Sequence, residues 1–237
     1  MYKNKSFLAL IPARGGSKGI PYKNIVKVNG KPLIQYTIDE ALHSNFLDRI
    51  VVSTDDEKIA EISKKCGAEV PFLRPKQLAD DNAKTIDVLL HALHELKKNG
   101  KVYDYLVLLQ PTQPLRKSWH IDEAINLIVD KQEESLVSVS PVREHPILMR
   151  TINKDGKVQN LLKTQSTIRR QDFPTYYKVN GAIYINKIND NFNKSTSLND
   201  NKLAYKMSKK YDLDIDEPID LEIFKFFISR KVNNSNL

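Results

Sequence analysis

The segment 8–24, with the sequence LALIPARGGSKGIPYKN, changes abruptly from an apolar run to a loop rich in glycine and positive charge. The apolar part is typical of a short buried strand, and Arg14, Lys18 and Lys23 follow it. Glycines allow the backbone to adopt positive φ and bring its N–H groups close to a ligand. Three cations on one loop would neutralise a polyphosphate, so the segment indicates a nucleoside triphosphate site. The glycines of the loop are Gly15, Gly16 and Gly19.

The glycine pattern alone is not specific, because glycine-rich turns after strands are common. The loop matches neither the GxxxxGKS/T pattern of phosphate-binding P-loops nor the GxGxxG pattern of dinucleotide-binding folds. A tight surface turn with solvated lysines is therefore the alternative interpretation of this segment.

Strand-like and helix-like patterns alternate through the first 140 residues. Short apolar runs of strand type are Phe7–Ile11, Ile50–Ser53, Glu69–Phe72, Tyr105–Leu109 and Leu136–Val139. Helical periodicity is found in Leu33–His43, Glu57–Lys65, Ile86–Lys98 and Ile121–Val129. The alternation predicts an α/β fold with an open, mostly parallel sheet flanked by helices. In such sheets ligands bind beyond the carboxyl ends of the strands, where the cationic loop would lie.

The pattern changes after residue 142. Residues 143–178 have no helical periodicity, and an Asp155–Gly156 turn separates the possible strands Ile147–Ile152 and Val158–Leu161. This pattern predicts a small hairpin insertion within a domain formed by residues 1–142 and 179–237. A surface hairpin without a functional role is the alternative interpretation of the insertion. The elements predicted after it are the strands Val179–Ile185 and Tyr205–Met207 and a helix over Pro218–Lys231.

Charge and composition restrict the class of protein. The chain has 37 Lys and Arg against 29 Asp and Glu, a formal charge of +8, but the lysines are scattered rather than massed on one helix. An anionic small-molecule substrate accounts for this charge, so we expect no nucleic acid partner. No segment reaches the length of a membrane span, and the single cysteine, Cys66, excludes an intramolecular disulfide. We expect a cytoplasmic enzyme without membrane association.

Two aspartates near the C-terminus form a candidate metal site. Asp214 and Asp216 are two positions apart on an extended segment, so their side chains point to the same face. Two carboxylates arranged in this way can share a hard cation such as Mg²⁺, which would also bridge phosphate oxygens. Helix capping is the alternative, because Asp216 precedes Glu217, Pro218 and a helical run.

Several strings in a fixed order add a family resemblance that covers residues 8 to about 221. They are IPARGGSKGIPYKN, RPKQLADD from Arg74, LLQPTQPLR from Leu108, RRQDFP from Arg169, NGAIYI from Asn180 and DLDIDEPIDL from Asp212. In this order they resemble the sugar-activating cytidylyltransferases, in particular the CMP-sialic acid synthetases. The resemblance implies a Rossmann-like nucleotidyltransferase fold and Mg²⁺ dependence, with Mg²⁺ held by Asp214 and Asp216. It also implies a homodimer in which the insertion 143–178 completes the active site of the partner.

The resemblance also assigns roles to single residues. It places Lys18 and Lys23 on the phosphates of CTP, and Arg14 of the same loop can hydrogen-bond two phosphate oxygens at once. The residues implied for the rest of the nucleotide are Asn24, Arg74 and Thr85, and those implied for the sugar acid are Gln110, Arg170, Lys178 and Tyr184. Two positions depart from the family pattern: Lys178 replaces an arginine of some members, and Gln113 stands where serine is common.

The resemblance implies an enzyme that transfers CMP from CTP to the anomeric hydroxyl of a nonulosonic acid, with release of pyrophosphate. N-Acetylneuraminate is the expected acceptor, and legionaminate is the first alternative because both departures fall where acceptor groups could be recognised. A cytidylyltransferase for the eight-carbon sugar acid of lipopolysaccharide and a non-catalytic CTP-binding module are more distant alternatives. The CMP-sugar would feed lipooligosaccharide or capsule synthesis.

Overall fold

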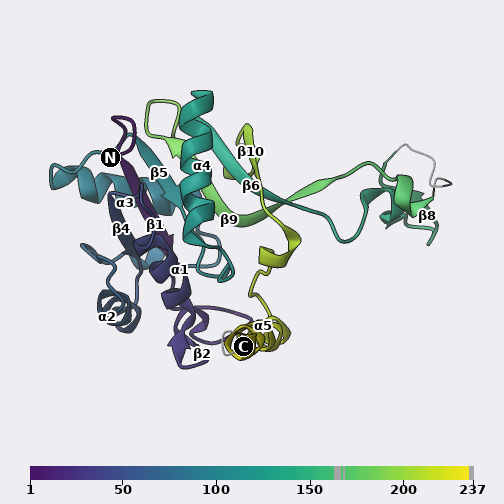
Figure 1. Cartoon of the computed structure of the whole chain (residues 1–237), viewed down its shortest axis with the longest axis horizontal. Coiled ribbons are helices and arrows are strands. Elements are labelled where there is room, and N and C mark those ends of the chain that lie inside the picture. Colours follow the sequence, from purple (N-terminus) through teal and green to yellow (C-terminus); the bar gives the residue numbers. More distant parts are fainter. Residues whose placement is uncertain (163–166, 168, 235–237) are drawn as a thin grey trace.

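A six-stranded sheet forms the centre of the computed structural model, which describes residues 1–162, 167 and 169–234, without the side chains of residues 170 and 231–234 (Figure 1). Its strands are β1 (Phe7–Pro12), β4 (Arg49–Ser53), β5 (Tyr105–Leu108), β6 (Ser135–Pro141), β9 (Tyr177–Lys187) and β10 (Leu203–Lys206), in the order β10-β6-β9-β5-β1-β4. All neighbouring pairs are parallel except those of β9, which runs antiparallel to β5 and β6. The expected open, mostly parallel sheet is confirmed.

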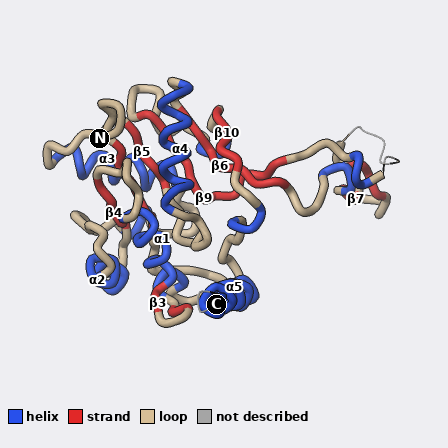
Figure 2. The backbone as a smooth tube through the Cα atoms, viewed as in Figure 1, coloured by secondary structure: helices blue, strands red, loops and turns tan. Residues whose placement is uncertain are grey.

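Helices cover both faces of the sheet, as the tube in Figure 2 also shows. Alternate residues of β1 divide between two hydrophobic clusters, because successive side chains of a strand point to opposite faces. Phe7, Ala9 and Ile11 pack in a cluster with residues of α1 (Leu33–Leu42), α2 (Glu57–Lys65) and α4 (Ser118–Lys131). Leu8 and Leu10 pack instead with residues of α3 (Thr85–Lys98). β1 is therefore buried on both faces, which explains its continuous apolar sequence.

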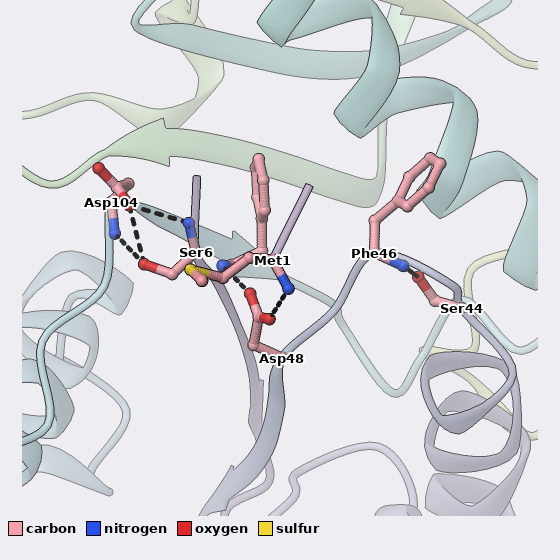
Figure 3. A network of polar contacts seen from close by, with 7 residues as sticks. Met1, Ser6, Ser44, Phe46, Asp48 and Asp104 are labelled. Atoms are coloured by element: carbon pink, nitrogen blue, oxygen red, sulfur yellow. Dashed lines mark hydrogen bonds and ion pairs between the residues drawn. The ribbon is translucent and has the colours of Figure 1, made fainter. Parts of the chain in front are cut away.

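Two carboxylates fix the start of β1 (Figure 3). The Asp104 carboxylate accepts hydrogen bonds from the backbone N–H and the hydroxyl of Ser6, both at 2.9 Å. The Asp48 carboxylate accepts from the backbone N–H of Phe7 at 2.7 Å and pairs with the amino group of Met1. These contacts satisfy backbone donors at the end of the strand opposite to the cationic loop.

The C-terminal helix α5 (Pro218–Asn234) packs against the segment that follows β1. Leu221 and Phe224 are buried in a third cluster with Val28 and Leu33, and Ile215 of the acidic segment belongs to the same cluster. Val28 lies in the small hairpin formed by β2 (Lys27–Val28) and β3 (Lys31–Pro32). This packing holds the acidic segment beside the cationic loop.

The insertion forms the hairpin expected from the sequence. β7 (Arg150–Ile152) pairs antiparallel with β8 (Val158–Asn160), and Gly156 has a φ of 75° in the turn between them. The hairpin lies at the end of a long extension from the body of the protein (Figure 1). Residues 163–166 and 168 of the insertion lie outside the described structure.

One predicted strand is absent. In Glu69–Phe72 only Glu69 pairs with the sheet, through an isolated bridge to Val51. The next residues include Pro71, which has no backbone N–H to continue the ladder.

The described residues also form short 3₁₀ helices, which are Lys23–Ile25, Lys76–Leu78, Pro146–Leu148, Arg170–Asp172, Leu198–Asp200 and Lys209–Tyr211. No helix among the described residues is long and apolar enough to cross a membrane.

Candidate active site

A cavity of about 560 Å³ lies beside the cationic loop and the ends of β1 and β5. It brings together most of the predicted site residues, although they come from segments spread over the whole chain. Those that line it are Arg14, Lys18, Lys23, Asn24, Arg74, Thr85, Gln110, Asp214 and Asp216. The predicted phosphate-binding, nucleotide-binding and metal-binding residues therefore face one space.

A second cavity of about 330 Å³ adjoins the first. Gln110 and Asp214 line both cavities, while Lys178, Tyr184 and Gln113 line only the second. The backbone of Arg170 begins a 3₁₀ helix in the insertion, and its side chain lies outside the described structure. With the exception of Arg170, the residues predicted for the sugar acid thus lie together at the second cavity. The assignment of Arg170 stays a prediction.

Asp81 pairs with two of the loop cations, and the sequence analysis did not identify it. Its two carboxylate oxygens lie 2.9 Å from Arg14 Nη1 and 2.9 Å from Lys18 Nζ. The hydrogen bond from Lys18 is the largest influence and lowers the pKa of Asp81; partial loss of hydration opposes it, and the hydrogen bond from Arg14 lowers the pKa further. The Asp81 carboxylate therefore holds the two cations close together in the way that an anionic ligand would.

Lys23 links the cationic loop to the acidic segment. Its Nζ donates to the carbonyl of Ile215 at 2.7 Å and to Asp216 Oδ1 at 2.9 Å. The Lys23 side chain is 15% exposed, whereas that of Asp216 is 69% exposed, so the lysine is fixed while the carboxylate still faces the cavity. The buried Asn24 donates from Nδ2 to the carbonyl of Arg14 at 3.1 Å and so stabilises the loop itself.

The loop glycines do not adopt the positive φ that was one of the two reasons expected for them. Gly15, Gly16 and Gly19 all have φ outside the positive region, so the loop does not depend on left-handed backbone. A Cβ at Gly19 would lie 2.5 Å from the backbone carbonyl of Asp216, and one at Gly15 would lie 3.0 Å from Asp56 Cβ. Close approach of other segments therefore explains these two glycines.

This contact gives a prediction for Gly19→Ala. The new methyl group would push the acidic segment away from the loop, because the atom that it meets is backbone rather than a flexible side chain. We expect kcat for the reaction proposed below to fall by about tenfold or more, since displacements of about 1 Å already reduce catalysis strongly. Gly16→Ala is the matched control, because a Cβ at that position meets no heavy atom within 4 Å. Equal activity of the two variants would contradict this explanation.

Asp214 and Asp216 suit a hard cation better than they suit helix capping. The carboxylate that caps the start of α5 belongs to Asp220, whose Oδ2 accepts from the backbone N–H groups of Asp216 and Glu217 at 3.0 and 2.8 Å. This contact leaves the side chains of Asp214 and Asp216 to line the first cavity. Mg²⁺ is commonly bound by one or two carboxylates together with substrate phosphates and water, so the pair fits such an ion.

The surroundings of Asp214 disfavour its charged form. Water reaches the carboxylate through the cavity, but the surrounding walls remove part of its hydration and raise its pKa. The charge of Asp216 raises the pKa further, while a hydrogen bond from Thr112 and the charges of Lys23 and Lys178 lower it. A divalent cation between the two aspartates would relieve their repulsion.

The nucleotide side of the first cavity contains a buried arginine. Arg74 is 6% exposed, its Nη2 lies 3.5 Å from Asp55 Oδ1, and burial lowers its pKa. Asp55 Oδ1 also accepts from the backbone N–H of Gly15 at 3.1 Å, which connects Arg74 to the cationic loop. Thr85 is the first residue of α3, where free backbone N–H groups favour an anion or a carbonyl oxygen.

In the second cavity, Lys178 is one of the residues predicted for the sugar acid. Its Nζ lies 3.2 Å from Oδ2 of Asp212, whose side chain is 2% exposed. Tyr184 donates from its hydroxyl to Asn199 Oδ1 at 3.1 Å, and burial raises its pKa. Asp212 and Asn199 were not identified from the sequence, because both lie far along the chain from the residues that they contact.

Comparison with known proteins shows which family the chain belongs to. A family model described as cytidylyltransferase matches residues 8–230. An N-acylneuraminate cytidylyltransferase of Streptococcus agalactiae serotype V is 38% identical over 211 residues, which are 88% of this chain and 50% of the relative. A CMP-N,N'-diacetyllegionaminic acid synthase of Legionella pneumophila is 40% identical over 220 residues, 90% of this chain and 92% of the relative. This chain thus spans about half the length of the streptococcal relatives.

A further sequence relative and a solved structure are also similar to this chain. A pseudaminic acid cytidylyltransferase of Campylobacter jejuni is 34% identical over 97% of this chain and 98% of its own. A solved CMP:2-keto-3-deoxy-manno-octonic acid synthetase complexed with CTP superposes with a TM-score of 0.72 over 95% of this chain and 99% of its own, at 17% identity, which confirms the fold. With the match over residues 8–230, these similarities show that the chain belongs to the cytidylyltransferase family, in the branch of the CMP-sialic acid synthetase type.

Proposed function

We propose that this protein transfers CMP from CTP to the anomeric hydroxyl of a nonulosonic acid. The hydroxyl oxygen attacks the α-phosphorus in line, and a new P–O bond forms. The bond between the α-phosphorus and its bridging oxygen to the β-phosphate breaks, and pyrophosphate leaves with the electron pair. The hydroxyl proton is released, and the products are the CMP-sugar and pyrophosphate.

The observation that carries this proposal is the wall shared by the two cavities. Gln110 and Asp214 line both, so a ligand in the first cavity and a ligand in the second would meet beside the acidic pair. The larger cavity contains the cations suited to a triphosphate, and the smaller one contains Lys178, suited to a carboxylate. Placing the two reactants side by side supplies much of the catalysis in such reactions.

The loop cations would stabilise charge that grows on the pyrophosphate during the transfer. Arg14 and Lys18 are held together by Asp81, and a triphosphate would take the place of this carboxylate between them. Lys23 is held independently by the carbonyl of Ile215 and by Asp216. Asp214 and Asp216 would hold Mg²⁺, which when bound neutralises the phosphates and lowers the pKa of the attacking hydroxyl.

N-Acetylneuraminate is the acceptor that we propose, and N,N'-diacetyllegionaminate is the second candidate. The streptococcal relatives named for N-acylneuraminate match along about half their length. The relative named for diacetyllegionaminate matches along 92% of its length at slightly higher identity. This near-complete coverage is the observation that favours the second candidate.

The test is pyrophosphate release from CTP and Mg²⁺ with each of the two acceptors in parallel. Turnover with either one supports the proposed reaction, and the ratio of the two kcat/KM values identifies the preferred acceptor. 3-Deoxy-manno-octulosonate serves as a third arm for the eight-carbon alternative. CTP binding without turnover of any of these acceptors would contradict the proposed acceptors and indicate a different keto-acid sugar or a binding module.

We also propose that the protein is a homodimer held together by the insertion 143–178. The hairpin at the end of the insertion exposes apolar side chains, among them Ile152 at 73% and Val158 at 69%. Apolar side chains on a protruding segment are typical of a surface that another chain covers. The insertion of one protomer, the arm, would then reach the second cavity of its partner. Arg170 of the insertion would contact the acceptor there.

The arm is tested by the double substitution Ile152→Asp and Val158→Asp. We expect the protein to change from dimer to monomer in light scattering, and kcat/KM for the acceptor to fall by about tenfold or more, because charges replace apolar interface anchors. Lys154→Asp, in the exposed turn of the same hairpin, is the control. A monomer that retains full activity would contradict this role of the arm.

A further inference from the structure

Gln113 lies in a fixed turn directly after β5, at the second cavity. Its backbone N–H donates to the carbonyl of Gln110 at 3.2 Å, and its carbonyl accepts from the backbone N–H of Arg116 at 3.4 Å. These two contacts form consecutive turns that determine where the Gln113 side chain begins. The residue lines the second cavity and is only 1% exposed, so it lies at the floor of this cavity rather than at its mouth.

The amide of Gln113 is unpaired at both ends. Neither Oε1 nor Nε2 has a hydrogen-bond partner among the residues that the structure describes. A buried amide in this state disfavours the folded protein, whereas an apolar side chain of similar size would not. Because the unpaired amide also lines the second cavity, a ligand group bound there would satisfy it.

Gly181 creates the space around this amide. It lies in β9 next to a register irregularity and has a φ of 74°, a conformation that favours glycine. A Cβ at this position would lie 2.5 Å from Oε1 of Gln110 and 3.7 Å from Nε2 of Gln113. The two glutamine amides therefore converge on the face of Gly181, beside the wall that both cavities share.

The charged side chains of the second cavity leave neutral ligand groups to amides such as those of Gln113 and Gln110. Lys178 is positively charged and suits a carboxylate, and Asp214 faces the first cavity as well as the second. Gln113 instead is neutral and offers one donor group and one acceptor atom. This combination complements a neutral polar substituent such as a hydroxyl or an acylamino group.

We propose that Gln113 is a specificity-determining residue that hydrogen-bonds a neutral hydroxyl or acylamino substituent of the bound acceptor sugar. The proposal rests on the function proposed above and adds the residue by which one acceptor is distinguished from another. A site built to hydrogen-bond a substrate group rejects analogues that lack it, because its own polar atoms then stay unpaired.

The test is Gln113→Met, which keeps the length of the side chain and removes both polar atoms. We expect kcat/KM for the preferred acceptor to fall by about tenfold to a hundredfold through its KM, with KM for CTP unchanged. N-Acetylneuraminate and N,N'-diacetyllegionaminate are compared, since they differ in the number of acetamido groups. The ratio of their kcat/KM values should move toward one, and the acceptor whose value falls more identifies the substituent that is recognised.

Thr37→Val is the matched control. Thr37 is 1% exposed and its hydroxyl is unpaired among the described residues, but it lies on α1 outside both cavities. Thr37→Val should leave kcat/KM for the acceptor and KM for CTP unchanged. Gln113→Leu replaces the methionine variant if the latter does not fold, as judged by its melting temperature. An unchanged acceptor ratio in a folded variant would overturn the role of Gln113 alone, whereas a wild-type protein that turns over no acceptor would overturn the proposed function as well.

Discussion

Replacing Asp214 by asparagine should lower kcat by about a thousandfold while CTP still binds. The substitution removes one of the two carboxylates proposed to hold Mg²⁺, and with it the charge stabilisation of the leaving pyrophosphate. The cations proposed to contact the phosphates come from a different part of the chain and keep their own partners, so the affinity for CTP should change little. Steady-state kinetics and CTP titration of the same preparation separate the two effects.

The fold of the variant should be intact, because asparagine has nearly the same shape as aspartate. Burial and the neighbouring Asp216 already raise the pKa of Asp214, so removing its charge relieves an unfavourable interaction in the protein without a bound cation. Its melting temperature should therefore be equal to that of the wild type or higher. Asp130→Asn, on the exposed part of α4, is the control and should be fully active. Full activity of Asp214→Asn would remove the metal assignment.

Lys23→Ala should reduce kcat by about a hundredfold or more, with little change in KM for the acceptor. Lys23 is the loop cation tied directly to the acidic segment, through the carbonyl of Ile215 and the carboxylate of Asp216. A cation fixed beforehand at the position where negative charge grows stabilises the transition state more than the bound substrate. The effect is measured by steady-state kinetics with each substrate varied in turn.

The matched control for this prediction is Lys27→Ala, because Lys27 is exposed on β2 four residues away and lines neither cavity. It should leave kcat unchanged. If Lys23→Ala weakened acceptor binding as much as it lowered kcat, Lys23 would act through folding or general binding rather than in the transfer itself.

The helices and most strands could be predicted because each depends on a pattern of neighbouring residues in the sequence. Each predicted helix is present, and β1 was identified by a continuous apolar run bounded by a change to glycine and charge. Glu69–Phe72 has a similar composition but forms only one bridge, since Pro71 interrupts the ladder and the edge of the sheet offers no second partner. Composition alone does not reveal whether a neighbouring strand is present.

The site could be predicted only where its residues occur in recognisable strings. Lys23 and Asp216 were identified separately, but their 2.9 Å contact joins residues 193 positions apart. Asp81 was missed because its partnership with Arg14 and Lys18 depends on how two loops fold against each other. Gly19 was identified, but the positive φ expected for it was wrong, since the glycine allows the close approach of the Asp216 backbone. Such contacts depend on the tertiary fold, which short-range patterns do not specify.

The most direct test of the account follows the phosphorus atoms of CTP. CTP labelled at the α-phosphate or at the γ-phosphate is incubated with Mg²⁺ and each acceptor in turn, and the sugar product is separated from pyrophosphate. Attack at the α-phosphorus predicts that the α-label moves to the sugar and that the γ-label is found only in pyrophosphate. A γ-label on the sugar, or release of inorganic phosphate without a labelled sugar, would contradict the proposed transfer of CMP.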